Sequence, residues 1–232
     1  MLKTRICDIF GIEYPIVQAP MNWITCAELV AAVSNAGGLG VFGPNAGADR
    51  PSLDPKVVAE RLRSQIRKAR TLTNKPFAVN LSAAVQPRAV SDEQFRQSPA
   101  QAMFGEAYIQ TAIEERVPVA YTSVGSPEVI TKRLHEAGMK VMHIVAAVRH
   151  AKRAEAAGVD AIIVGGYEAG GHSVGHDEIP LLTLLPQVVD AVKIPVIAGC
   201  GIADARGLVA AFALGAEGIC MGSAFMAVHE IP

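Results

Sequence analysis

Short apolar runs alternate with helical segments along the whole sequence, and this alternation limits the fold more than any other feature. Several of the apolar runs are β-branched and apolar on both faces, as expected of parallel strands covered on both sides. The runs are Ile16–Ala19, Leu39–Phe42, Phe77–Leu81, Val117–Thr122, Val141–Val145, Ala161–Val164, Val196–Ala198 and Gly218–Met221. The segments between them with helical spacing are Cys26–Ala36, Pro55–Ala69, Pro127–Ala137, Val148–Ala157, Leu181–Val192 and Ala205–Leu214.

Three of the helical segments end alike, with a glycine one or two residues before the next strand: Ala137-Gly138, Ala157-Gly158 and Leu214-Gly215. Repeated strand–helix–strand units require right-handed crossovers and a parallel sheet. Eight strands in strict alternation favour a closed α/β architecture, the (β/α)8 TIM barrel, over an open doubly wound sheet. No stretch has the composition of a linker, so we expect residues 1–232 to form a single barrel domain.

Two regions depart from the regular pattern. Ala83–Ala107 contains Pro87, Pro99 and many polar residues, which predicts a mobile excursion before the next helix. After the last strand only Gly222–Pro232 remains, which is too short for a full eighth helix. We therefore expect either a fragment, with the barrel truncated in or before that helix, or a seam that something else covers. An exposed seam there would favour a homo-oligomer.

Composition excludes several classes of protein. The formal net charge is −1, so no basic field would draw the chain to nucleic acid. No apolar run is long enough to span a membrane, and the first residues lack the apolar core of a signal peptide. The four cysteines form no Cys-x-x-Cys pair, which predicts reduced, mostly buried thiols in a cytoplasmic protein and no zinc site.

A glycine-rich stretch with two histidines, Gly165–His176, follows the strand Ala161–Val164. Glycines allow a backbone to approach a ligand closely, and histidine is the side chain most readily titrated near neutral pH. Two interpretations stay open at this point: a flexible turn with a solvated histidine, or a ligand-facing loop with an acid/base group. His172 and His176 are four residues apart, but the glycines around them argue against a helix and so against a metal site.

Other polar and glycine-rich positions follow further strands, and in a barrel these ends form the active site. Glycines after two neighbouring strands expose backbone amides that could bind a phosphate; they could equally be tight turns. The positions are Gly199, Gly201, Gly222 and Ser223. Asn80 could cap the next helix, satisfy backbone groups or face a heterocyclic ring. For Glu168, a solvated loop charge is the favoured interpretation over catalysis.

These motifs together resemble the nitronate monooxygenase family, formerly called 2-nitropropane dioxygenases. Tyr167–His172 is similar to the family's Glu-Ala-Gly-Gly-His signature, and four further motifs fall in the family's order over the whole chain. They are Ile12–Met21, Pro76–Leu81, Pro195–Asp204 and Met221-Gly222-Ser223. Some relatives have Ser-Gly-Gly where this chain has Gly199-Cys200-Gly201. Family members usually continue further, into a small helical region that is absent here.

The resemblance implies an FMN-dependent flavoprotein. By resemblance, Ala19, Pro20 and Met21 lie along the isoalloxazine, Asn80 bonds the flavin, and Gly170 and Gly171 let the backbone pass close to it. Gly199, Gly201, Gly222 and Ser223 hold the FMN phosphate, and His172 is the catalytic base. The implied reaction is the oxidation of alkyl nitronates or nitroalkanes by dioxygen to a carbonyl compound and nitrite.

Three other activities remain open. Two are flavin enzymes of the same family, an NADH:quinone reductase and a flavin-dependent enoyl-acyl-carrier-protein reductase, for which NAD(P)H would be the electron donor. The third is a non-catalytic phosphate- or nucleotide-binding barrel fragment. The expected partners are a small-molecule substrate and dioxygen, with no nucleic acid and no membrane.

Overall fold

The computed structural model describes residues 3–52, 54–83, 99–170 and 179–231. Within these residues the protein forms one sheet of eight parallel strands, each neighbouring pair in register. The (β/α)8 barrel expected from the sequence is confirmed. The strands are β1 (Ile16–Gln18), β2 (Gly40–Phe42), β3 (Phe77–Ser82), β4 (Val119–Ser123), β5 (Lys140–Val145), β6 (Ala161–Gly165), β7 (Val196–Gly199) and β8 (Gly218–Met221).

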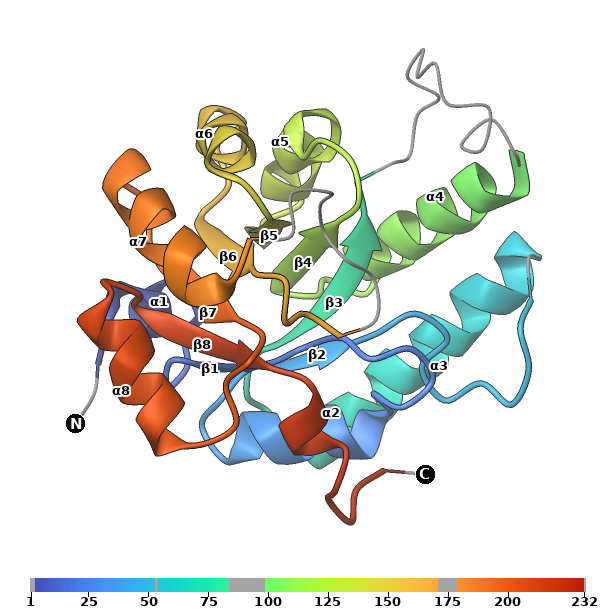
Figure 1. The fold of residues 1–232 in the computed structure, drawn as a ribbon. Helices are drawn as coiled ribbons and strands as arrows, with labels where there is room; N and C mark the ends of the chain where they lie inside the picture. The colour runs from blue at the N-terminus through green and yellow to red at the C-terminus, as the bar shows by residue number, and fades with distance from the viewer. Residues whose placement is uncertain (1–2, 53, 84–98, 171–178, 232) are drawn as a thin grey trace.

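Helices surround the outside of the sheet (Figure 1). They are α2 (Ala27–Asn35), α3 (Pro55–Leu72), α4 (Pro99–Glu114), α5 (Glu128–Glu136), α6 (Val148–Ala156), α7 (Leu181–Ala191) and α8 (Ala205–Ala213); a further helix, α1 (Arg5–Phe10), precedes β1. The chain order alternates strand and helix from β1 to β8. The six helices expected from sequence spacing are present within a few residues of their expected ends.

The three predicted helix–glycine–strand units share one local structure. Gly138, Gly158 and Gly215 have φ values of 80°, 81° and 91°, in the left-handed region that glycine adopts without a steric penalty. The residue after each glycine donates its N–H back to a helix carbonyl, as Met139 does to Leu134 O at 3.0 Å. This is the hydrogen-bond pattern of a glycine-terminated helix, and it turns the chain into the next strand.

The barrel closes between β1 and β2, the two ends of the strand order. Val17 and Leu39 form a parallel bridge there, with Gln18 N donating to Leu39 O at 2.9 Å. The Gln18 side chain extends this pairing: its Oε1 accepts from Val41 N at 2.9 Å, and its Nε2 donates to Val41 O at 3.3 Å. A buried side-chain amide thus takes the place of a strand's backbone at the closing seam.

Alternate residues of each strand fill two apolar layers. The inner layer includes Val17, Val41, Ala78, Tyr121, Met142, Ile163, Ile197 and Cys220, one residue from each strand. The outer layer packs strand residues such as Phe42 and Ile162 against helix residues such as Leu62, Leu134 and Leu184. The period of two in a strand therefore assigns each apolar side chain either to the barrel interior or to the helix layer.

Helix α1, for which the sequence pattern raised no expectation, packs into the inner layer. Ile6 and Phe10 belong to the same buried cluster as Val17 and Ile197. Arg5 pairs with Glu217, the residue before β8, and donates to Lys193 O at 2.9 Å, ahead of β7. These contacts lie where the strands begin, so α1 covers the amino-terminal end of the barrel.

Two expectations about irregular regions need correction or refinement. The excursion expected over Ala83–Ala107 is wrong in its second part, because α4 begins at Pro99, a residue that fits the first turn of a helix; residues 84–98 lie outside the described part of the chain. After β8, the described residues contain a single 3-10 turn, η1 (Ser223–Phe225), and no α-helix. Phe225 packs with Cys26, Leu29 and Val33, and Figure 1 shows this segment beside α2.

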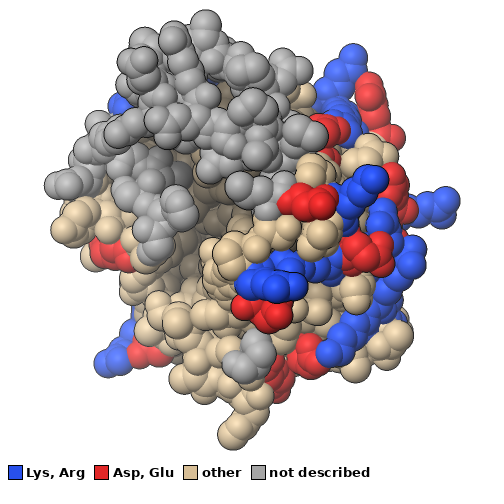
Figure 2. Space-filling view, turned by 90° about the vertical axis from the view of Figure 1, so that its right-hand side faces the viewer, with Lys and Arg blue, Asp and Glu red and all other residues tan. Residues whose placement is uncertain are grey.

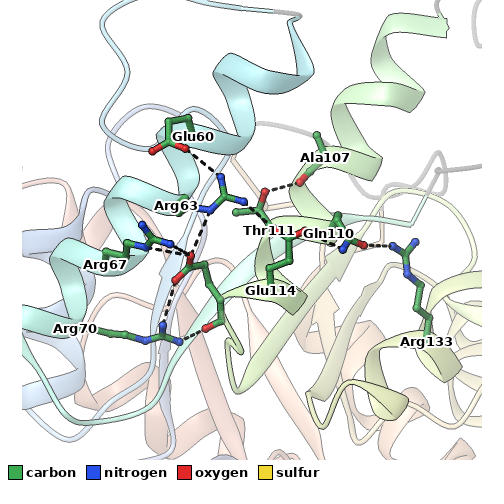
Figure 3. Close-up of polar contacts among 10 residues, drawn as sticks. Glu60, Arg63, Arg67, Arg70, Ala107, Gln110, Thr111, Glu114 and Arg133 are labelled. Atoms are coloured by element: carbon green, nitrogen blue, oxygen red, sulfur yellow. Dashed lines mark hydrogen bonds and ion pairs between the residues drawn. The ribbon is translucent and has the colours of Figure 1, made fainter.

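The outer surface carries both signs of charge. On the face shown in Figure 2, Lys and Arg side chains are interspersed with Asp and Glu. One group links α3 to the end of α4: Arg63, Arg67 and Arg70 contact the carboxylate of Glu115 at 3.3, 2.8 and 3.4 Å (Figure 3). Arg63 also pairs with Glu60 at 3.0 Å and with Glu114 at 2.6 Å, so three carboxylates lie among the three arginines.

The sequence also predicted reduced, mostly buried thiols and no membrane-spanning segment. Cys7, Cys26 and Cys220 are buried and Cys200 is partly exposed, and all four are free thiols, as expected. In the described ranges, no helix has the length and apolar character needed to cross a membrane.

Candidate functional site

The strands bring most of the predicted site residues to one end of the barrel. Gly199 at the end of β7 is in register with Gly165 on β6 and with Cys220 on β8. Met221 on β8 is in register with Gln18 on β1, which places Gly222 beside Ala19. The turns after β1, β6, β7 and β8 therefore meet, although up to about two hundred residues separate them in the sequence.

At this end the inward-facing positions have almost no side chains. Ile163, Ile197, Val17 and Cys220 face inward, and two residues further along their strands are Gly165, Gly199, Ala19 and Gly222. A Cβ built on Gly199 would lie 2.8 Å from Ile163 Cγ2, so that position has no room for a side chain. The result is a region with few side chains at the carboxyl ends of β1, β6, β7 and β8, which we call the glycine floor.

Met21 borders the glycine floor. A Cβ built on Gly222 would lie 3.7 Å from Ala19 Cβ and 4.0 Å from Met21 Sδ. Thr25, which sequence reasoning missed, holds this turn: its buried Oγ1 donates to Met21 O at 2.9 Å and accepts from Gly43 N at 2.6 Å. No sequence signal marks Thr25, because its contact with Gly43 depends on the packing of the turn after β1 against that after β2.

Asn80 lies on β3, and its parity matches that of the inward-facing Ala78. Its Nδ2 donates to Tyr121 O and to Ser123 Oγ, both at 3.1 Å. The bond to Tyr121 O satisfies a backbone carbonyl, which is one of the roles that the sequence left open. Both bonds use the amide nitrogen and orient the side chain, so Oδ1 is the atom of Asn80 that could accept a hydrogen bond from a ligand.

The turns after β7 and β8 supply backbone amides. Cys200 and Gly201 have φ values of 81° and 64°, so the turn after β7 is left-handed at two successive residues. Ser223 begins a 3-10 turn, whose first N–H groups have no acceptor within the turn. At the start of α8, by contrast, the Arg206 amide already has a partner, because Arg206 N donates to Asp204 Oδ1 at 2.9 Å. Amides that could bind an anion are thus found at the two predicted turns and not at α8.

Glu168 is exposed but is not the solvated loop charge that we expected. Its carboxylate accepts hydrogen bonds from Leu181 N, the first amide of α7, at 2.9 and 3.2 Å. Negative charge is favourable at a helix N-terminus, where amides lack intrahelical partners. Sequence spacing could not reveal this contact, because 13 positions separate Glu168 from Leu181 in the sequence.

Cys200 contacts the same group of residues. Its Sγ accepts from Gly166 N at 3.1 Å and lies 3.9 Å from Glu168 Oε2. Burial, together with the smaller effect of the neighbouring Glu168, raises the pKa of the Cys200 thiol to about 11, against the lowering effect of the Gly166 N–H bond. The side chain is therefore a neutral thiol that can donate S–H and accept N–H at once.

The remaining predicted residues lie outside the described part of the chain or have no assigned contact in it. Gly171, His172 and His176 lie outside the described residues. Gly170 is exposed, and a Cβ built there would meet no described atom within 4 Å. The roles of Pro20 and of all the predicted ligand-binding residues stay predictions.

Comparisons with known proteins agree with the barrel and its motifs. A family model described as nitronate monooxygenase matches residues 3–232. A probable nitronate monooxygenase of Staphylococcus aureus (strain MSSA476) is 38% identical over 98% of this chain and 69% of its own. A second relative, from Rhodococcus jostii (strain RHA1), is named (3aS,4S,5R,7aS)-5-hydroxy-7a-methyl-1-oxo-octahydro-1H-indene-4-carboxyl-CoA dehydrogenase. It is 36% identical over 99% of this chain, and the chain spans 56% of that relative.

Two solved structures are also similar. FabK from Thermotoga maritima superposes with a TM-score of 0.83 and 38% identity, over 100% of this chain and 65% of that one. A nitroalkane oxidase from Streptomyces ansochromogenes gives a TM-score of 0.80 and 30% identity, over 98% of this chain and 70% of that one.

Proposed function

Because this chain belongs to the nitronate monooxygenase family, we propose that it is an FMN-dependent oxidoreductase that oxidises alkyl nitronates or nitroalkanes with dioxygen. The products would be a carbonyl compound and nitrite. The chain spans little more than half the length of one of its relatives, so the proposal concerns the chemistry of the barrel and its cofactor.

The glycine floor is the observation that carries this proposal. At the carboxyl ends of four adjacent strands lie Ala19, Gly165, Gly199 and Gly222, which carry at most a methyl group, so a flat ring could approach the backbone there. A phosphate-bearing aromatic cofactor needs such a surface and, at its edge, amides for the phosphate. The turns after β7 and β8 adjoin the floor at the expected position for that phosphate.

The residues present fit FMN. Ala19, Pro20 and Met21 would line the isoalloxazine ring, with Asn80 Oδ1 as a hydrogen-bond acceptor for it. Gly170 and Gly171 would allow close approach of the backbone. The amides of Gly199, Gly201, Gly222 and Ser223 would hold the phosphate. When bound, FMN would supply the redox chemistry, taking electrons from the substrate and passing them to dioxygen.

His172 is the proposed catalytic base. A nitroalkane carries a carbon-bound α-proton, which a neutral imidazole can remove when it is held close to the substrate and partly shielded from water. Alkyl nitronates have already lost this proton and would not need the base. Two of the described histidines do not fit this role, since His143 is buried beside Thr122 and His135 is bonded to Asp160.

A spectrum followed by anaerobic titration tests the proposal. We expect purified protein, or protein mixed with FMN, to show bound-flavin absorbance that propyl-2-nitronate bleaches when oxygen is absent. Rapid bleaching by NADH, with none by the nitronate, would contradict the monooxygenase activity. Protein that stays colourless after FMN is added would support a non-catalytic barrel instead.

One comparison favours a second candidate. A relative 36% identical to this chain is named a carboxyl-CoA dehydrogenase. The same floor and phosphate-binding turns could serve a flavin enzyme that acts on a thioester substrate with NAD(P)H. The NADH arm of the anaerobic titration, repeated with an acyl-CoA, distinguishes this activity from nitronate oxidation.

A further inference from the structure

The turns after β6 and β7 are held together by a small group of polar contacts. Gly166 N donates to Cys200 Sγ at 3.1 Å, which joins the end of β6 to the turn after β7. Glu168 Oε2 lies 3.9 Å from the same sulfur and 2.9 Å from Leu181 N at the start of α7. One carboxylate and one thiol therefore connect three separate parts of the chain.

The packing in this group leaves little freedom. A Cβ on Gly166 would lie 2.4 Å from Leu181 N and 2.6 Å from Glu168 Oε2, distances that real atoms do not adopt. On the other side, a Cβ on Gly201 would lie 3.5 Å from Glu168 Cβ. Glu168 thus fills the space between the two glycine turns, and each turn limits the position of the other.

Cys200 has a backbone conformation that needs such support. Its φ of 81° is in the left-handed region, which costs a residue with a Cβ free energy and persists only where the surroundings hold it. The bonds from Gly166 N and to Glu168 fix the Cys200 side chain on one side of the turn. The amide of Gly201, the next residue, is oriented as a consequence.

We propose that Glu168 is a positioning residue: with Cys200 it sets the turn after β7 against the turn after β6, and so orients the amides that would bind the cofactor phosphate. The inference rests on the proposed function for the identity of the ligand. It does not assign Glu168 any contact with substrate or with FMN.

Two measurements on the full chain test this role. The dissociation constant for FMN is obtained from flavin fluorescence quenching. The rate of Cys200 alkylation by iodoacetamide at pH 8.5, followed by mass spectrometry, reports the Glu168–Cys200 contact without any flavin. The variants are Glu168→Ala, which removes all the contacts, and Glu168→Gln, whose amide oxygen can still accept from Leu181 N.

Asp54→Ala is the matched control. Asp54 accepts from Lys56 N at 2.9 Å at the start of α3, so its loss removes a helix cap as Glu168→Ala does. Among the described residues, the carboxylate of Asp54 bonds only within its own turn. The control therefore lowers the melting temperature without touching the turns after β6 and β7.

We expect Glu168→Ala to weaken FMN binding about tenfold and to speed Cys200 alkylation at least about threefold. Glu168→Gln should stay within about twofold of the wild type for FMN, and Asp54→Ala should match the wild type in both measurements. Unchanged FMN affinity in Glu168→Ala, or an equal loss in Asp54→Ala, would overturn the proposal.

The measurements distinguish a failure of the proposed function from a failure of the positioning role of Glu168. Wild-type protein that binds no FMN contradicts the proposed function, and the alkylation rates then decide the positioning role. In that case a wild-type alkylation rate in Glu168→Ala would overturn the role of Glu168, and a raised rate restored by Glu168→Gln would support it.

Discussion

Gly222 lies against Ala19 with just enough room for one methyl group: a Cβ on Gly222 would be 3.7 Å from the Cβ of Ala19. These residues follow β8 and β1, neighbouring strands from opposite ends of the chain. Their contact forms part of the glycine floor, and several predictions depend on that floor or on the groups around it.

Larger side chains at position 222 should block FMN from the glycine floor to an increasing extent. Gly222→Ala places a methyl group at ordinary contact distance and should weaken FMN binding less than about threefold, whereas Gly222→Leu should weaken it at least about a hundredfold. Gly222 has a negative φ of −107°, so neither change strains the backbone. Fluorescence titration with FMN measures the effect, and circular dichroism checks the fold. Equal affinity for Gly222→Leu and wild type would show that the cofactor does not use this surface.

Removing the proposed base should affect the turnover of two substrates differently. In His172→Ala we expect turnover of neutral nitroalkanes to fall at least about a hundredfold, because the α-proton has no acceptor. Turnover of nitronates, which lack that proton, should be largely retained. Steady-state oxygen consumption with nitroethane and with ethyl nitronate measures both. His229→Ala, near the end of the chain, is the control. Equal retention of both activities would remove His172 from this role.

The Cys200 thiol should react slowly although it is partly exposed. Its pKa is raised to about 11, mainly by burial, so only roughly one thiol in a thousand is ionised at pH 8, against about a quarter for an ordinary cysteine. The other three thiols are buried. We expect Ellman's reagent to label native protein at least about a hundredfold more slowly than free cysteine, and to label four thiols after unfolding. Rapid labelling of one native thiol would contradict the assigned contacts.

His143 should make the fold sensitive to mild acid. Burial, and secondarily the nearby His150, lower the pKa of His143 to about 4, while its Nδ1 lies 2.9 Å from Thr122 Oγ1. The unfolded chain, with a histidine pKa of about 6.5, binds more protons between those values. Stability contributed by the neutral ring is therefore complete above about pH 6.5 and is lost as the pH falls toward 4, by at most about 3 kcal/mol.

His143→Asn is the variant that tests this effect, because it cannot titrate. Urea unfolding at pH 4.5 and 7 should show a smaller decrease in the free energy of unfolding for the variant than for the wild type. Asp160, whose pKa is lowered, loses its contribution only at lower pH, below its ordinary value of 3.8. An identical decrease in both proteins over this range would mean that His143 is charged in the folded state.

The closing seam of the barrel should depend on the Gln18 side chain. Gln18→Leu keeps the volume but leaves Val41 N–H and C=O without the partners that Gln18 now supplies at 2.9 and 3.3 Å. Burying unpaired backbone groups should lower the free energy of unfolding by about 2 kcal/mol. Chemical denaturation measures this, with Gln187→Leu as the control, since Gln187 is exposed and bonds only Thr183 O. A loss below about 0.5 kcal/mol would show that the seam closes without Gln18.

The sequence predicted the fold well because its signals are local. Apolar runs such as Ala161–Val164 indicate strands through their neighbours alone, and Gly138, Gly158 and Gly215 end helices because each residue itself adopts a positive φ. The prediction was wrong at Pro99, where a helix begins within a polar region, and α1 was missed because a six-residue helix carries too little periodic pattern.

The candidate site was predicted only in part. The glycines after β6, β7 and β8 were found because turn glycines after strands are visible along the chain. Thr25 and Gln18 had no such signal, and Glu168 was assigned to solvent, because each is defined by a partner on another turn or strand.

The sequence by itself therefore determined the alternation of strands and helices and the barrel that follows from it, since periodicity and glycine conformation act between near neighbours. The tertiary structure decided which distant residues meet: Gly222 with Ala19, Gln18 with Val41, and Glu168 with Leu181 and Cys200. Those pairings depend on strand register and on the packing of separate turns. A one-residue shift in register would turn each inward-facing side chain outward, and no local pattern in the chain encodes such a contact.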